Sequence, residues 1–172
     1  MPGGTDTPVR GDLAGFGLRL GAYLLDGLLY GLLALVFVIP AIVIGFDAFD
    51  GCTWVENDSG NEFLLECPSG APSAGSLVAA GALLVAGWLI VAIIYLRALG
   101  RTGQTWGRRI VGIKVIGETT GEPIGFGRAL GRQLFAGVIS SYVFYLGYLW
   151  MIWDDKNQTW HDKVVGSIVV TN

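Results

Sequence analysis

The sequence predicts an all-α integral membrane protein with a small cytoplasmic β element. Two long apolar runs, residues 20–46 and residues 77–96, carry most of that prediction. The composition agrees with it, because 52% of the 172 residues are hydrophobic and only 15% are charged, which is too apolar for a soluble domain of this length. Two β-branched segments farther along the chain predict the β element.

Both apolar runs exceed the roughly 20 residues that a helix needs to cross a bilayer, so we expect spanning helices at residues 20–46 and 77–96. The first run is also too long for the apolar part of a signal peptide. A third run, residues 129–153, is long enough but carries Arg132 near its start and two serines in its middle. It forms either a third spanning helix or a re-entrant hairpin that breaks near residues 137–141.

Basic residues are distributed unevenly between the predicted loops. Residues 47–76 contain no Lys or Arg and six acids, whereas seven basic residues lie from Arg97 to Arg132. Since Lys and Arg favour the cytoplasmic side, we expect the 47–76 loop on the extracytoplasmic side of the cell membrane and the 97–128 loop on the cytoplasmic side. The N-terminus then lies in the cytoplasm, where residues 1–17, rich in Gly, Pro and Thr, form a flexible tail.

The only two cysteines, Cys52 and Cys67, both fall in the expected outward loop. An oxidising compartment and a separation of 15 residues favour a disulfide, worth about 3 kcal/mol if it is unstrained. The alternatives are two free thiols or a metal site, although a metal would lack further ligands there.

The two β-branched segments are residues 110–116 and residues 164–170. Neither is stable alone, so we expect them to pair into a small sheet. Three full membrane crossings would place them on opposite sides of the bilayer, where strands cannot pair. Either the third apolar run is a hairpin and the C-terminus is cytoplasmic, which we favour, or the two strands never meet.

Arg19 and Asp26 are the most informative polar residues, because charges inside an apolar run are costly. They are seven residues apart, which puts them on one helix face about 10 Å apart along the axis. Tyr23 and Tyr30 share that face. The stripe suits a proton path, an ion site or an interhelical lock. Arg19 alone could extend to the cytoplasmic interface, but the deeper Asp26 must be neutral, paired or hydrated.

Glycine spacing on the same run predicts close packing of another helix. Two G-x-x-x-G spacings, Gly17 with Gly21 and Gly27 with Gly31, favour dimerisation or a partner helix, although a chain with 27 glycines also produces such spacings by chance. The sequence therefore allows a helix interface without establishing one.

The remaining polar motifs favour membrane contacts over catalysis. The only histidine, His161, stands beside Asp162, and a membrane-surface capping cluster fits it better than a metal or proton-shuttle site. The glycine-rich stretch 100–107 lacks a phosphate-loop spacing, and no serine-hydrolase elbow is present. We therefore expect no enzyme, cofactor, metal or nucleic-acid partner, and expect Arg101, Arg108 and Arg109 to hold anionic lipid headgroups.

Several ordered motifs resemble the RDD family of membrane proteins. They are RLGAYLLDGLLYG, GRTGQTWGRRIVGIKVI, GEPIGFGRALGRQ and DDKNQTWHDKVVGSIVV. The resemblance covers residues 17–170, and the residues that name the family map onto Arg19, Asp26 and Asp162. It implies one membrane domain at residues 18–172, and a suggested role in transport of unknown ligands, with cation/proton antiport in some members. It also gives Asp162 and Arg132 functional weight.

Two hypotheses of different classes follow. The first is a homo-oligomer that moves an ion or small solute, with Asp26 exchanging protons. The second is a non-catalytic accessory or scaffold subunit, whose buried charges lock the fold and whose glycines receive the helices of a membrane protein partner. The residues expected to carry function are Arg19, Tyr23, Asp26, Arg132 and Asp162.

Overall fold

The computed structural model describes residues 12–56, 60, 63–68, 72–140 and 146–172. The expected flexible tail therefore lies largely outside the described residues, as do parts of the cysteine loop and of the third apolar run. The chain divides into two compact units, each described by itself below. Unit 1 comprises Met1–Gly31 with Ala92–Asn172, and unit 2 comprises Leu32–Val91.

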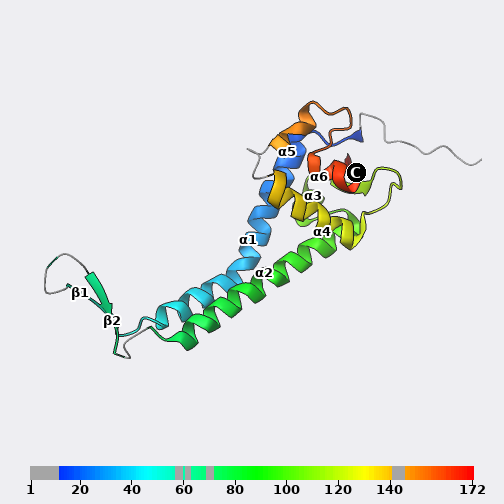
Figure 1. Ribbon diagram of the computed structural model, residues 1–172. Helices are drawn as coiled ribbons and strands as arrows, with labels where there is room; N and C mark the ends of the chain where they lie inside the picture. The colour runs from blue at the N-terminus through cyan, green and yellow to red at the C-terminus, as the bar shows by residue number, and fades with distance from the viewer. Residues whose placement is uncertain (1–11, 57–59, 61–62, 69–71, 141–145) are drawn as a thin grey trace, which may run out of the picture. The chain divides into compact units, whose positions relative to one another are not determined.

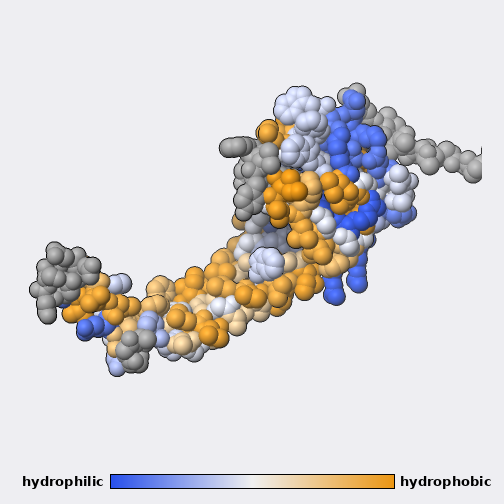
Figure 2. Space-filling view, in the orientation of Figure 1, coloured by the Kyte–Doolittle hydropathy of each residue, from blue (hydrophilic) through white to orange (hydrophobic). Residues whose placement is uncertain are grey.

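Two long helices confirm the two predicted apolar segments. Helix α1 is Phe16–Asp47 and helix α2 is Ala74–Thr102, both long and apolar enough to cross a membrane (Figure 1). Their 32 and 29 residues correspond to about 48 and 44 Å at 1.5 Å per residue, more than the roughly 30 Å of a hydrocarbon core. Hydrophobic residues cover their visible surface (Figure 2), and Val36 and Trp88 are 65% and 70% exposed. Such a surface suits lipid better than water.

In unit 2, the later part of α1 packs against the early part of α2 through small residues. A Cβ atom at Gly87 would come within 2.6 Å of Cγ of Phe37, so the phenyl ring fits only because residue 87 is glycine. Gly45 similarly faces Ala80 at ordinary contact distance. This is the close approach that small residues allow between membrane helices.

The loop between the two helices contains a β-hairpin that the sequence analysis did not predict. Strand β1 (Thr53–Glu56) pairs antiparallel with β2 (Phe63–Glu66), with Thr53 opposite Glu66. The predicted disulfide between Cys52 and Cys67 is confirmed, and it joins the residues that immediately flank the paired strands.

In unit 1, the predicted pairing of the two β-branched segments is confirmed. Strand β3 (Ile113–Gly117) pairs antiparallel with β4 (Ser167–Thr171). The first strand begins later than expected because Trp106–Ile110 form the short helix α3. The sheet carries the core of the unit, in which Leu99, Ile113, Val115 and Val169 are almost fully buried.

The N-terminal boundary needs a correction. Residues up to 17 were expected to form a flexible tail, but Leu13 forms a β-bridge with Val170. Ala14 is fully buried, and its N–H donates a hydrogen bond to the Val169 carbonyl at 2.9 Å. The ordered domain therefore starts before α1, because β4 accepts this segment along its edge.

The third apolar run is interrupted within the described residues. It begins in helix α4 (Gly125–Phe135) and continues as the π-helix η2 (Ala136–Ser140). After residues 141–145, which lie outside the description, come helix α5 (Leu146–Leu149) and the 3₁₀ turn η3 (Trp150–Ile152). A third spanning helix is not confirmed. The π-helix coincides with the break expected near residues 137–141.

Candidate functional site

The candidate site lies in unit 1, where α3, α4, α5 and α6 gather around the N-terminal part of α1 (Figure 1). Asp162 belongs to helix α6 (Trp160–Val165) and is fully buried. It forms a capping box with Thr159: the Asp162 N–H donates to the Thr159 hydroxyl oxygen at 3.3 Å, and the Thr159 N–H donates to the Asp162 carboxylate at 3.2 Å. The Thr159 hydroxyl also donates to that carboxylate at 2.8 Å. Asp162 therefore helps to cap α6, which is the capping part of the membrane-surface cluster expected here.

Two arginines from different helices converge on the same carboxylate. Nη1 of Arg19 in α1 lies 2.6 Å from Oδ2 of Asp162, and Nη2 of Arg132 in α4 lies 2.7 Å from Oδ1. The Ser167 hydroxyl contributes a further hydrogen bond at 3.2 Å. Burial alone would raise the pKa of Asp162, but the charges of Arg132 and Arg19 outweigh it and hold the pKa far below its ordinary value. Asp162 is therefore ionised.

These contacts show that Arg19 does more than extend to the interface. Its side chain is 12% exposed and its guanidinium is committed to Asp162, with Nε donating to the Ala14 carbonyl at 3.2 Å. The structure thus joins Arg19, Arg132 and Asp162 into one ion-pair cluster. The sequence pointed to Arg19 through its place in an apolar run, but it gave Arg132 and Asp162 functional weight only through the family resemblance. It did not predict the ion pairs, because Arg19 and Asp162 are separated by 143 positions.

Asp26, the other charged residue of the predicted stripe, binds a different segment. Its carboxylate accepts hydrogen bonds from the Thr105 hydroxyl and from the Gly107 N–H, the latter at 2.7 Å. A Cβ atom at Gly107 would overlap the Ala22 carbonyl and lie 2.7 Å from the Asp26 nitrogen. Only glycine therefore lets α3 approach α1 closely enough for this contact. Thr105 and Gly107 were not predicted as partners, although both lie in a motif shared with the family.

The tyrosines of the stripe have separate environments. Tyr30 is buried and stacks on Trp106, with ring centroids 4.5 Å apart and planes inclined by 8°. Tyr95 contacts the Tyr30 ring edge-on, with ring centroids 5.2 Å apart. Tyr23 is 69% exposed. The predicted stripe is thus one helix face, but its members contact three different parts of unit 1.

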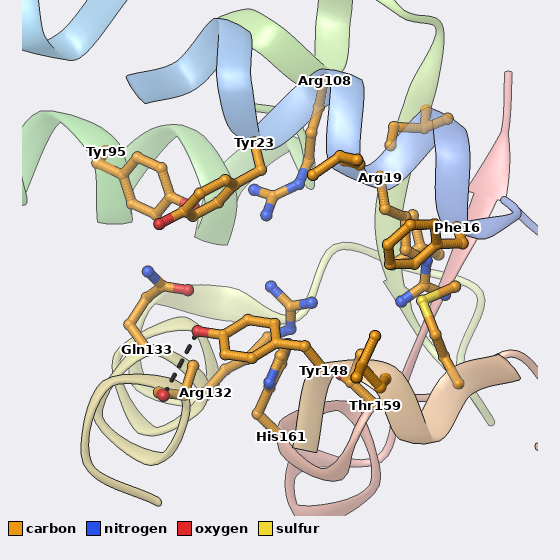
Figure 3. Close-up of a pocket in the computed structure, with 16 residues that line it drawn as sticks. Phe16, Arg19, Tyr23, Tyr95, Arg108, Arg132, Gln133, Tyr148, Thr159 and His161 are labelled. Atoms are coloured by element: carbon orange, nitrogen blue, oxygen red, sulfur yellow. Dashed lines mark hydrogen bonds between the residues drawn. The ribbon is translucent and has the colours of Figure 1, made fainter. Parts of the chain in front are cut away.

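A cavity of about 310 Å³ lies beside the ion-pair cluster (Figure 3). Three arginines line it, Arg19, Arg108 and Arg132, and Figure 3 shows Arg108 and Arg132 entering from opposite sides. The other polar side chains in the lining are Tyr23, Tyr95, Gln133, Tyr148, Thr159 and His161. Apolar side chains, including Leu20 and Met151, complete the wall. Arg101, Arg108 and Arg109 were all expected at lipid headgroups, but of these three residues only Arg108 lines the cavity.

Arg108 differs in its partners from Arg19 and Arg132, the other two arginines that line the cavity. Its Nη1 donates to the Thr105 hydroxyl oxygen at 3.3 Å, and its guanidinium lies 5.9 Å from the Tyr95 ring centroid. Among the described residues, no carboxylate lies within ion-pair distance of it. Thr105 therefore links the guanidinium group of Arg108 to the carboxyl group of Asp26 through one hydroxyl group.

His161 lies at the cavity wall and is 4% exposed. Its ring meets Tyr148 edge-on at 5.0 Å. Burial, followed by the charge of Arg132, lowers the pKa of His161 to about 3, so the imidazole is neutral at physiological pH. In the part of the chain that the structure describes, Nδ1 of His161 and Nη2 of Arg19 are buried without a hydrogen-bond partner.

These features define a mostly helical protein with two candidate membrane spans and a buried arginine–aspartate cluster beside a cavity. The chain belongs to the RDD family, whose model matches residues 13–166, nearly its whole length. Family membership and the two apolar helices together indicate a membrane protein.

Curated relatives include the proline-rich antigen homolog of Mycobacterium tuberculosis and the proline-rich antigen of Mycobacterium leprae, both 41% identical to this chain. The matched segments cover 41% and 40% of this chain but only 29% and 27% of those proteins. The uncharacterized protein YxaI of Bacillus subtilis is 25% identical over 91% of this chain and 96% of its own length. No solved structure matches.

Proposed function

We propose that this protein binds a small solute in the arginine-lined cavity and takes part in its transport across the membrane. The observation that carries the proposal is the position of the cavity, which is bordered by the first residues of a helix long enough to span a bilayer. A concave, largely apolar site with a few convergent polar groups is the usual form of a small-molecule site, and about 310 Å³ is the size of a small one.

The contacts of the two aspartates favour solute binding over proton exchange at Asp26. Asp26 already accepts two hydrogen bonds, and Asp162 is held by two guanidinium groups. A cation would have to displace these donors from either carboxylate, and each displaced donor would then be buried unpaired. We therefore assign the aspartates to building the cavity, and we assign no catalytic step to the protein.

The proposed location is the cell membrane, with both termini in the cytoplasm and the disulfide-bonded hairpin outside. The pairing of β3 with β4 supports this arrangement, because hydrogen-bonded strands must lie on one side of a bilayer. The basic residues between Arg97 and Arg132 supply the cytoplasmic bias, and contacts of exposed Arg101 and Arg109 with anionic headgroups would add to it.

A second candidate, an accessory or scaffold subunit, is supported by a different observation. A methyl group added at Gly27 or Gly31 of α1 would have no described atom within 4 Å. The surface of α1 at these two glycines is therefore not covered by any described residue. A helix from a second copy or from another membrane protein could pack closely there. Transport through a 172-residue chain would also need such an assembly.

Reconstitution tests the transport proposal. Purified protein in liposomes would be challenged with alkali cations, inorganic anions and small organic anions, and charge movement recorded on a solid-supported membrane. We expect wild type to respond to at least one solute, and Arg108→Gln to lose at least tenfold in that response. Arg97→Gln is the matched control, because Arg97 is exposed on α2 and does not line the cavity.

The opposite result would favour the accessory role. If no solute moves in wild type, and the protein instead co-purifies with a stoichiometric partner that Gly27→Leu releases, transport is the wrong function. A homo-oligomer that retains solute movement supports the first proposal.

A further inference from the structure

Three guanidinium groups surround the cavity, whereas two carboxylates lie close to them among the residues that the structure describes. Asp162 pairs with Arg19 and Arg132, and Asp26 reaches Arg108 only through the Thr105 hydroxyl. His161 is neutral and adds no charge. The cavity therefore keeps one positive charge in excess, on the arginine that lacks a direct ion pair. Arg108 is half-buried, and a partly desolvated charge that lacks a counter-ion favours binding of an anion.

Unsatisfied hydrogen-bonding groups are found in the same place. His161 is 4% exposed, and its Nδ1 has no partner among the described residues, nor has the buried Nη2 of Arg19. Buried polar atoms are nearly always hydrogen-bonded in folded proteins, so each such atom calls for an explanation. Both residues line the cavity beside Arg132. A bound group with acceptor oxygens would satisfy the arginine nitrogens directly.

The rest of the lining is unsuited to a bare inorganic ion. Phe16, Leu20, Ile113, Leu149, Met151 and Val169 contribute apolar surface, and Tyr95 and Tyr148 add aromatic rings. An inorganic anion would leave this surface in contact with water or empty. Phe16, Leu20 and Tyr23 are also 41%, 44% and 69% exposed on α1. The cavity thus continues onto the side of α1 that is apolar enough to face lipid.

We infer that the cavity holds an amphipathic anion: one carboxylate or phosphate head that pairs with Arg108, on an apolar body that lies against the α1 side of the wall. This rests on the proposed solute-binding function and names its substrate class. The head supplies the missing negative charge, and charge-assisted hydrogen bonds to guanidinium are among the stronger ones in proteins. Both a free acid and an anionic lipid have this chemistry.

Ligand binding to the purified protein tests the inference independently of transport. Decanoate is the probe, compared with acetate and inorganic phosphate, which have the head alone, and with decanol, which has the chain alone. Isothermal titration in a non-ionic detergent gives the affinities. We expect decanoate to bind wild type at least tenfold more tightly than the other three. Equal binding of decanol, of acetate or of phosphate would overturn the inference.

Variants then test the role of Arg108. Arg108→Gln should weaken decanoate binding at least tenfold, Arg108→Lys should weaken it less because the charge remains, and Arg97→Gln should bind like wild type. If Arg108→Gln does not fold, the Lys variant and the salt dependence of wild-type binding still decide. Unchanged affinity in the Lys variant together with salt-independent binding in wild type would overturn the assignment of Arg108.

Native mass spectrometry distinguishes the two sources of the ligand. Protein from nanodiscs of phosphatidylglycerol should retain one lipid that decanoate displaces if the ligand is an anionic headgroup, and none if it is a free acid. Either result supports an amphipathic anion as the ligand, whereas a retained phosphatidylcholine that decanoate displaces equally would count against it.

Decanoate binding without solute movement in liposomes would contradict the transport proposal and leave this inference intact. Movement of small hydrophilic solutes without decanoate binding would contradict this inference and leave the transport proposal intact.

Discussion

At the scale of single residues, Asp162 organises the polar cluster. Its buried carboxylate receives Arg19, Arg132, the Thr159 hydroxyl and the Ser167 hydroxyl. The gain from such a cluster is offset by the cost of removing three charges from water, so the pairs need not stabilise the fold relative to apolar residues. Removing one member is different, because the others stay buried without a counter-charge.

Asp162→Asn should therefore lower the free energy of unfolding by about 3–5 kcal/mol, since both guanidinium groups lose their buried carboxylate. Denaturant unfolding in detergent, followed by circular dichroism, measures the loss. Lys156→Gln is the control: it removes the more exposed ion pair with Glu118, and its effect on the free energy of unfolding should be much smaller because solvent screens that pair. Equal losses in the two variants would contradict the importance assigned to the cluster.

A pH dependence follows from His161. The pKa of its imidazole is lowered to about 3 in the folded protein, against about 6.5 in an unfolded chain. Below pH 6.5 the unfolded state binds a proton that the folded state does not, so stability is complete above this pH and falls as the pH drops toward 3. The slope from this group reaches about 1.4 kcal/mol per pH unit.

Unfolding of wild type and His161→Gln between pH 7 and pH 4.5 measures this slope, and the variant should be flatter. Asp162 affects stability at lower pH than His161 does. Because its pKa is depressed in the folded protein, its contribution to stability is lost only as the pH falls below about 4, the ordinary pKa of aspartate. Identical slopes in wild type and variant would show that His161 is protonated or exposed in the folded state.

At the scale of secondary-structure elements, periodicity and composition predicted what local sequence determines. The two apolar runs became α1 and α2, and the β-branched segments became β3 and β4. The hairpin β1–β2 was missed because each strand has only four residues among turn-forming ones. A break near residues 137–141 was expected because the two strands could not pair across a bilayer, but no local rule predicts the π-helix at Ala136–Ser140.

Prediction of the site failed where partners come from distant segments. Arg19 and Asp26 were expected on one helix face, but that face did not reveal that Arg19 pairs with Asp162 in α6, or that Asp26 binds Thr105 and Gly107. Arg108 was assigned to the surface because a basic loop is normally solvated. Its place in the cavity depends on how α3 packs against α1, which a glycine decides.

Gly107→Ala should therefore cost about 1–3 kcal/mol, because its methyl group overlaps backbone atoms of α1 that cannot move aside. Gly27→Ala is the matched control in the same unit: its methyl group meets no described atom within 4 Å, and alanine is the better helix former by about 0.5–1 kcal/mol. Thermal unfolding in detergent should thus shift in opposite directions. A downward shift for Gly27→Ala at high protein concentration only would reveal a helix interface at that surface of α1.

At the scale of the whole molecule, the pairing of β3 with β4 constrains how the chain crosses the membrane. Both strands lie in unit 1, and their hydrogen bonds cannot form through hydrocarbon. The residues between them must then cross the bilayer an even number of times or not at all. A single full crossing by residues 129–153 is incompatible with this sheet, whereas the change from α-helix to π-helix at Ala136–Ser140 is compatible with a re-entrant or surface segment.

The C-terminus and the cysteine loop should accordingly lie on opposite sides of the cell membrane. A cysteine at Asn172, in a Cys52→Ser, Cys67→Ser background, should resist a membrane-impermeant maleimide on intact cells and react after permeabilisation. In wild type, Cys52 and Cys67 should react on intact cells only after reduction, since they form a disulfide. Labelling of the Asn172 position from outside would require β4 to be exported while β3 stays with the basic loop. Because the strands pair residue by residue from Ile113 opposite Thr171 to Gly117 opposite Ser167, that outcome would separate the sheet and, with it, α6 and Asp162 from the cluster.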